Sequence, residues 1–123
     1  MKYVDIMRKA IFAKYSMVRY YYTQLLMTSL ASTTGYRKAM YKPMFFEYPE
    51  DLNAYIDIKY NVMLGDALKM SVNSDTLGQN TTTFYFPPGV WCNIFSPDQK
   101  CLTSKGENVT LGTKAYDINV HLR

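Results

Sequence analysis

Residues 41–51, YKPMFFEYPED, open the stretch from Tyr41 to Trp91 that decides the fold of this 123-residue chain. A short apolar run is closed by Pro49 and two carboxylates, which predicts a buried strand that delivers a loop. The stretch continues with MLGDAL at 63–68 and ends with YFPPGVW at 85–91, which predicts a strand interrupted by a tight turn. No residues within it indicate a chemical reaction by their spacing alone.

The segments on either side of position 55 differ in pattern. Apolar residues recur at spacings of three, four or seven over 2–32, which predicts a helix with a stripe broad enough to need cover on more than one side. Residues 39–46 predict a strand, which Pro43 confines to an edge, an end or a barrel. After Tyr55, short apolar pieces alternate with turn residues at intervals of about ten, as in all-β proteins. These pieces are 56–60, 67–72, 82–86, 90–95, 109–111 and 118–122.

The predicted fold class is therefore α+β, with a long N-terminal helix and one strand in residues 1–55 and part of an antiparallel β-sandwich in 56–123. The length is that of one modest domain. No run of about 18 apolar residues is present to span a bilayer, and the N-terminus has no apolar segment typical of a secretory signal.

Positive charge is concentrated at the N-terminal end, where eight basic residues precede position 43 against Asp5 alone. Such asymmetry is found on nucleic-acid-binding surfaces, but it is also produced by one solvated helix face. The basic residues are Lys2, Arg8, Lys9, Lys14, Arg19, Arg37, Lys38 and Lys42.

Two signals indicate the secretory pathway. Cys92 and Cys101 flank a polar segment and could close a small disulfide loop worth about 2.5 to 3 kcal/mol in an oxidising compartment. Asn80 and Asn108 each begin an Asn-x-Thr sequon in a polar, turn-rich stretch where a glycan is tolerated. We expect a secretory, lysosomal or extracellular location.

No catalytic, cofactor-binding or metal-binding residues emerge from the sequence. His121 is the single histidine and lies in a strand pattern, which favours a packed or surface role, and no metal-ligand spacing is present. The acidic cluster around Pro49 (Glu47, Glu50 and Asp51) is explained by solvation or by the first turn of a short helix. Asp66, after a glycine, is interpreted as a turn residue.

Six motifs nevertheless occur in one order along the chain: MRKA (7–10), YYYT (20–23), PMFFEYPED (43–51), MLGDAL (63–68), YFPPGVW (85–91) and INVHLR (118–123). Together they resemble the late segment of glycoside hydrolase family 31, the α-glucosidases. The resemblance covers nearly the whole chain and implies the last helix and strand of a (β/α)8 barrel followed by the start of a C-terminal β-sandwich domain. The family hydrolyses terminal α-linked glucose with retention, and its catalytic aspartates lie in segments with no counterpart here. The family usually has Arg-Pro where this chain has Lys42-Pro43.

One strand and one helix cannot close a barrel of roughly 250 residues, so we expect a chain that does not fold independently. The expected partner is the upstream catalytic part of the same kind of enzyme or another protein chain, with oligosaccharide met only in the assembly and no nucleic acid bound. The alternative is a catalytically inert structural or interaction subunit of a larger assembly. Its docking on an acidic or nucleic-acid surface requires the basic residues to share one exposed face.

Overall fold

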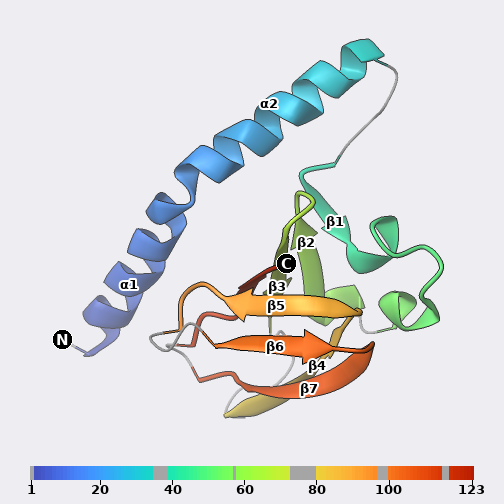
Figure 1. Ribbon diagram of the computed structural model, residues 1–123. Coiled ribbons are helices and arrows are strands. Elements are labelled where there is room, and N and C mark those ends of the chain that lie inside the picture. The colour runs from blue at the N-terminus through green and yellow to red at the C-terminus, as the bar shows by residue number, and fades with distance from the viewer. Residues whose placement is uncertain (1, 35–38, 57, 73–79, 97–99, 115–116) are drawn as a thin grey trace. The chain divides into compact units, whose positions relative to one another are not determined.

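The computed structural model describes residues 2–34, 39–56, 58–72, 80–96, 100–114 and 117–123 (Figure 1). The chain divides into two compact units, Met1–Met40 and Tyr41–Arg123. We call them the helical unit and the β unit. The assignment of 1–55 to a barrel and 56–123 to a sandwich stays a prediction.

The helical unit contains two helices, α1 (Lys2–Ser16) and α2 (Val18–Thr34), where the sequence predicts one. The break falls at Met17, whose N–H donates to the carbonyl of Lys14, three residues back, at 3.2 Å. The Ser16 hydroxyl donates to the Ala13 carbonyl at 2.8 Å, a back-bond that bends helices. The predicted stop at Gly35 lies outside the described residues.

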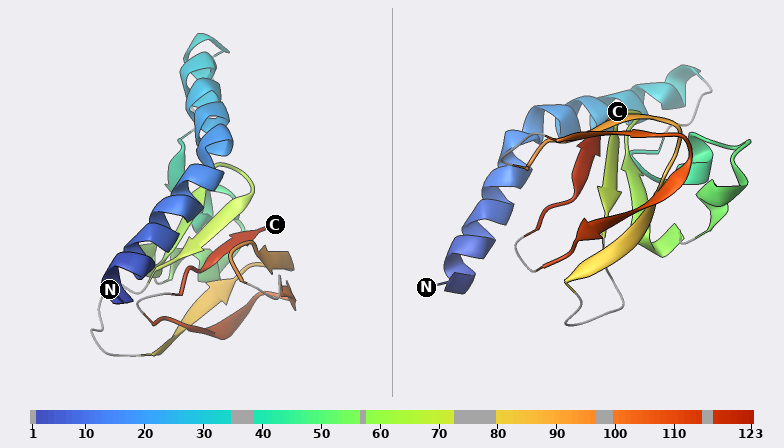
Figure 2. Two further views of the ribbon diagram at one scale, coloured as in Figure 1. Left: turned by 90° about the vertical axis from the view of Figure 1, so that its left-hand side faces the viewer. Right: turned by 60° about the horizontal axis from the view of Figure 1, so that its bottom comes forward.

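The β unit is built from antiparallel strands in two sheets among its described residues. One sheet has the order β1-β2-β3-β8-β5-β6, and in the other β4 and β7 run side by side (Figures 1 and 2). Helices followed by antiparallel, sandwich-like sheets confirm the predicted order of elements. The strands are β1 (Tyr41–Pro43), β2 (Asn61–Leu64), β3 (Leu68–Ser71), β4 (Thr81–Phe86), β5 (Gly89–Asn93), β6 (Cys101–Ser104), β7 (Glu107–Gly112) and β8 (Val120–Leu122).

The predicted strand at 39–46 is correct only for β1. Beyond Pro43 the chain forms a 3-10 turn, η1 (Met44–Phe46), in which the Met44 carbonyl accepts the N–H groups of Glu47 and Tyr48, both at 3.0 Å. Proline has no N–H for a strand ladder, so pairing ends there.

The predicted strand at 56–60 is wrong, because Ile58–Tyr60 is a 3-10 turn (η3) and the strand β2 follows it. The Tyr60 carbonyl accepts the N–H of Val72 at 2.8 Å, so this turn joins the end of the sheet without extending it. The sequence prediction also missed β2 and β6. The pieces predicted at 67–72 and 118–122 contain β3 and β8, and those predicted at 82–86, 90–95 and 109–111 overlap β4, β5 and β7.

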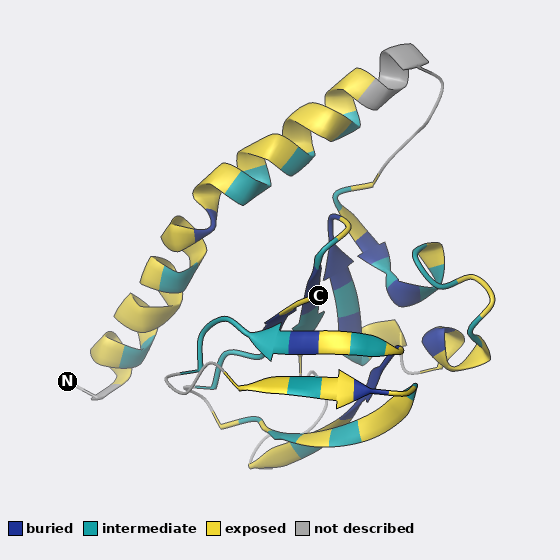
Figure 3. Ribbon diagram, in the orientation of Figure 1, coloured by how far each residue is buried: buried dark blue, intermediate teal, exposed yellow. Residues whose placement is uncertain are grey.

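Side chains from both sheets form the core of the β unit, and Trp91 is completely buried in it. Figure 3 shows buried stretches in strands of both sheets. The indole N–H of Trp91 donates to the Pro87 carbonyl at 2.9 Å, so the turn between β4 and β5 satisfies the buried donor. The Phe86 ring meets the Trp91 ring edge-on, with centroids 6.0 Å apart. The core consists of Met44, Ala54, Met63, Phe84, Tyr85, Phe86 and Trp91.

Replacing Gly89 should destabilise the β unit through the backbone. Gly89 has a φ of +145°, and a Cβ there would make only an ordinary 3.6 Å contact with Trp91 Nε1. Gly89→Ala is therefore expected to lower the free energy of unfolding by about 1–3 kcal/mol, from strain alone. Urea unfolding followed by fluorescence of Trp91, the single tryptophan, measures the change. Val90→Ala, at an exposed neighbour, should stay within about 0.5 kcal/mol, and an equal loss there would contradict the explanation.

Candidate functional site

The acidic loop predicted around Pro49 is held by structural contacts. Asp51 is the N-cap of the 3-10 turn η2 (Leu52–Tyr55), and its Oδ1 accepts the backbone N–H of Asn53 at 3.0 Å. Its other oxygen, Oδ2, accepts a hydrogen bond from the Tyr85 hydroxyl. Burial and this carboxylate raise the pKa of Tyr85 to about 12. The capping role is confirmed for Asp51, which also ties the loop to β4.

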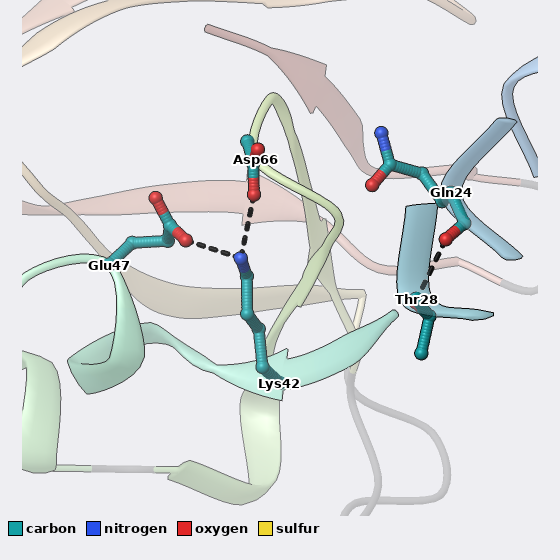
Figure 4. A network of polar contacts seen from close by, with 5 residues as sticks. All are labelled: Gln24, Thr28, Lys42, Glu47 and Asp66. Atoms are coloured by element: carbon teal, nitrogen blue, oxygen red, sulfur yellow. Dashed lines mark hydrogen bonds and ion pairs between the residues drawn. The ribbon is translucent and has the colours of Figure 1, made fainter. Parts of the chain in front are cut away.

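Lys42 draws two more carboxylates into a structural cluster. Its ammonium donates to Glu47 Oε1 and, at 2.8 Å, to Asp66 Oδ1, so it joins β1 to the acidic loop and to the β2–β3 turn (Figure 4). Burial opposes the charged form, but the hydrogen bonds and charges of Asp66 and Glu47 outweigh it and raise the pKa of Lys42. Asp66 is a turn residue, as predicted, and in addition a salt-bridge partner. Figure 4 also shows a separate contact within α2, from the Thr28 hydroxyl to the Gln24 carbonyl at 2.8 Å.

A second lysine, Lys69, lies fully buried in the centre of the large sheet, and the sequence analysis missed it. Its ammonium donates to Ser71 Oγ at 2.5 Å and lies 3.8 Å from the centroid of the Phe86 ring. Burial lowers the pKa of Lys69 to about 7. The described residues provide no ion pair for it. A lone lysine within the apolar run of β3 was the available signal.

His121 pairs with Lys69 across β8 and β3 and is buried, which confirms the predicted packed role. Its ring and the Phe86 ring form a T-shaped contact with centroids 4.9 Å apart. Its Nδ1 has no hydrogen-bond partner among the described residues. Burial, together with the nearby charge of Lys69, lowers the pKa of His121 to about 4. Because both side chains are shielded from solvent, we interpret them as core groups without access to a substrate.

The buried pair predicts that the β unit loses stability as the pH falls. Both groups have lower pKa values when folded (about 7 and about 4) than their ordinary values of 10.5 and 6.5. The unfolded chain therefore binds more protons, and stability declines from pH 10.5 to about 7 through Lys69 and from 6.5 to about 4 through His121.

The Lys69 contribution is tested with Lys69→Met, which should flatten the dependence of the unfolding free energy on pH between 7 and 10.5. Between pH 7 and 10.5, the change in the free energy of unfolding should be smaller in Lys69→Met than in the unchanged chain by at most about 5 kcal/mol. Lys59→Met is the matched control, because Lys59 is exposed and lies 4.9 Å from the Tyr60 ring. Urea unfolding at each pH, followed by Trp91 fluorescence, gives the values. A Lys69→Met profile as steep as that of the control would refute the explanation.

The helical unit carries a long exposed apolar surface. In α1, Val4, Met7, Ile11 and Tyr15 lie within one arc of the helix at 100° per residue, and all are more than half exposed. We call these four residues the helix stripe. Exposed apolar surface of this extent marks an interaction site. Figure 3 shows exposure along both helices. The other exposed large apolar residues of the unit are Tyr3, Phe12, Val18, Tyr22, Leu25, Leu26, Met27 and Leu30.

The basic residues of α1 do not share one face. Arg8, Lys9 and Lys14 are all exposed, but their positions lie about 100–140° apart around the helix axis. Arg37 and Lys38 lie outside the described residues. The single basic surface that the docking alternative requires is thus not formed within α1.

The cysteine pair and the two sequons, which led us to expect the secretory pathway, lie in the β unit. Cys92 and Cys101 face each other on β5 and β6 and are joined by a disulfide. Asn80 and Asn108 are both exposed, and their glycosylation stays a prediction. In the described parts of the chain, no helix is long and apolar enough to cross a membrane, and no three acidic, histidine or cysteine side chains are grouped to hold a metal.

The family follows from comparison with known proteins. Residues 37–123 match the model of the glycosyl hydrolase family 31 C-terminal domain. The chain belongs to glycoside hydrolase family 31. It is 35% identical over 115 residues to a probable α-glucosidase of Oryza sativa and 32% identical over 115 residues to an α-glucosidase of Hordeum vulgare. These alignments cover 94% of the chain but 12% of each relative, so the chain spans about an eighth of their length.

Solved structures of family 31 enzymes share the fold. A Flavobacterium johnsoniae dextranase superposes with a TM-score of 0.81 at 23% identity, over 100% of this chain and 14% of the enzyme. A cycloalternan-degrading enzyme from Trueperella pyogenes gives 0.80 at 24% identity, over 98% and 15%. At these identities the likeness establishes the fold alone.

Proposed function

We propose that this family 31 chain is a non-catalytic structural segment of an α-glucosidase-like enzyme that hydrolyses terminal α-linked glucose. The catalytic aspartates are supplied by an upstream part of the enzyme, on the same or another polypeptide. Family membership and the α-glucosidases among its relatives support the reaction class.

The observation that carries the proposal is the exposed helix stripe. Four large side chains of α1 point along one arc and are left in contact with water, which is costly unless another polypeptide covers them. A (β/α)8 barrel offers such cover, because its helices form a ring packed on the strands. The helical unit then supplies the last helix of that barrel, whereas β1 pairs antiparallel with β2 and belongs, with the rest of the β unit, to the C-terminal β-sandwich.

Three carboxylates of the β unit make structural contacts, which supports a non-catalytic role for this chain. A retaining glycosidase needs a nucleophile and an acid/base about 5–5.5 Å apart and open to the sugar. Here Glu47 and Asp66 are bound to Lys42, and Asp51 is bound to Tyr85 and to a backbone N–H. Each therefore has a structural partner, which favours a supporting function for this part of the enzyme.

The disulfide and the exposed sequons favour the secretory pathway, with a lysosomal or extracellular destination and glycans on Asn80 and Asn108. Lysosomal α-glucosidase of Mus musculus is among the relatives, 29% identical over 133 residues. A disulfide persists in oxidising compartments, which agrees with this route.

Reconstitution tests the proposal. We expect a Hordeum vulgare α-glucosidase truncated by the segment that this chain matches to be inactive alone and to hydrolyse maltose when co-expressed with residues 1–123. Ile11→Asp, on the helix stripe, should lower the restored activity at least tenfold, because it places a charge in the covered surface. Lys9→Asp, on another side of α1, should stay within twofold.

Two results would overturn the proposal. One is hydrolysis of maltose by the isolated chain. The other is an isolated chain that is a monodisperse monomer whose α1 and α2 amides are already protected from hydrogen exchange, since the helical unit would then need no cover. Hydrogen exchange also reports on the two units independently, because the β unit has its own core, which is expected to protect its strands.

A further inference from the structure

An open cavity of about 550 Å³ lies in the β unit. One wall is the acidic loop at 47–53, and the other is formed by the turns after β4 and β6, including Pro88 and Lys105. The volume lies within the range of about 300–1,000 Å³ typical of ligand sites. We call this cavity the loop groove.

The walls of the loop groove are braced by the contacts of the core. The hydrogen bond from Tyr85 to Asp51 connects the two walls directly. The Arg123 guanidinium lies 5.1 Å from the centroid of the Tyr48 ring, which holds that ring in place. At Gly106, with φ of +92°, a Cβ would lie 3.1 Å from the Tyr85 hydroxyl, so glycine permits the close approach of the second wall. A cavity with fixed walls is a better binding site than one that must first be ordered.

Two polar groups on the rim of the groove have no use in the fold. Glu50 and Lys105 are exposed, and within the described ranges neither forms a hydrogen bond or an ion pair. Together they present a carboxylate that accepts and an ammonium that donates. A sugar hydroxyl can donate to the Glu50 carboxylate or accept from the Lys105 ammonium. A charged ligand would be repelled by whichever of the two groups has the same sign of charge. Pro49, Pro88 and the Tyr48 ring add apolar surface for the C–H faces of a pyranose.

We propose that the loop groove is a second, non-catalytic binding site for α-linked glucose oligosaccharides. The groove favours a neutral polyhydroxylated ligand, and the choice of α-linked glucose rests on the proposed function. Such a site holds glucan on the β unit while the reaction takes place elsewhere in the assembled enzyme.

Amide NMR of the ¹⁵N-labelled 123-residue chain titrated with maltotriose tests the site. The expected result is saturable shifts confined to the amides of 47–53 and 104–107. The double variant Glu50→Gln/Lys105→Ala should weaken binding at least fivefold, while the matched pair Glu107→Gln/Lys59→Ala, which does not line the groove, should leave it within twofold. Cellotriose should bind at least fivefold more weakly than maltotriose.

The same variants in the reconstituted enzyme give a second readout. Calorimetry with an uncleavable, sulfur-linked maltotriose should find two sites per enzyme, and the Glu50→Gln/Lys105→Ala variant should retain one. No shifts in the groove, equal binding by the variant, equal binding of cellotriose, or a single site in the enzyme would each overturn the proposal. Failure of reconstitution would instead count against the proposed function, since the NMR titration does not depend on it.

Discussion

The removal of apolar surface from water is the constraint on which this structure depends. The helix stripe of α1 exposes Val4, Met7, Ile11 and Tyr15 along one arc. Burying a side chain of this size is worth about 1.5–3 kcal/mol, so burying all four would contribute as much as the whole stability of a typical domain, about 5–15 kcal/mol. The helical unit is therefore explained as part of a larger packed body.

The β unit meets the same constraint internally. Its two sheets and the 3-10 turns place Met44, Met63, Phe86 and Trp91 in one core with almost no exposure. The tight turn at Pro87 also satisfies the indole N–H, so burying the largest side chain leaves no donor unpaired. The two units thus differ: the helical unit exposes large apolar side chains, whereas the β unit buries its own core.

Polar groups inside the β unit serve that architecture. Lys42 binds two carboxylates and connects β1 to the adjacent acidic loop and to the β2–β3 turn, 24 residues further along the chain. Among the described residues, Lys69 contacts the Ser71 hydroxyl and the face of the Phe86 ring without an ion pair, and its position opposite His121 makes the core sensitive to protonation. Glu50 and Lys105, by contrast, remain on the surface beside a cavity. Lys42 and Lys69 are therefore held by contacts of the fold, whereas Glu50 and Lys105 are exposed to a ligand.

The sequence by itself determined the family, the order of a helical segment before antiparallel strands and the broad apolar surface of the N-terminal segment. These follow from local periodicity, turn residues and co-linear motifs, which act over a few residues at a time. Only the tertiary structure decided that Lys69 is buried, that Lys42 joins Glu47 to Asp66 and that two loops enclose a groove. Each of these depends on strand register and on contacts between distant segments, which no local pattern specifies.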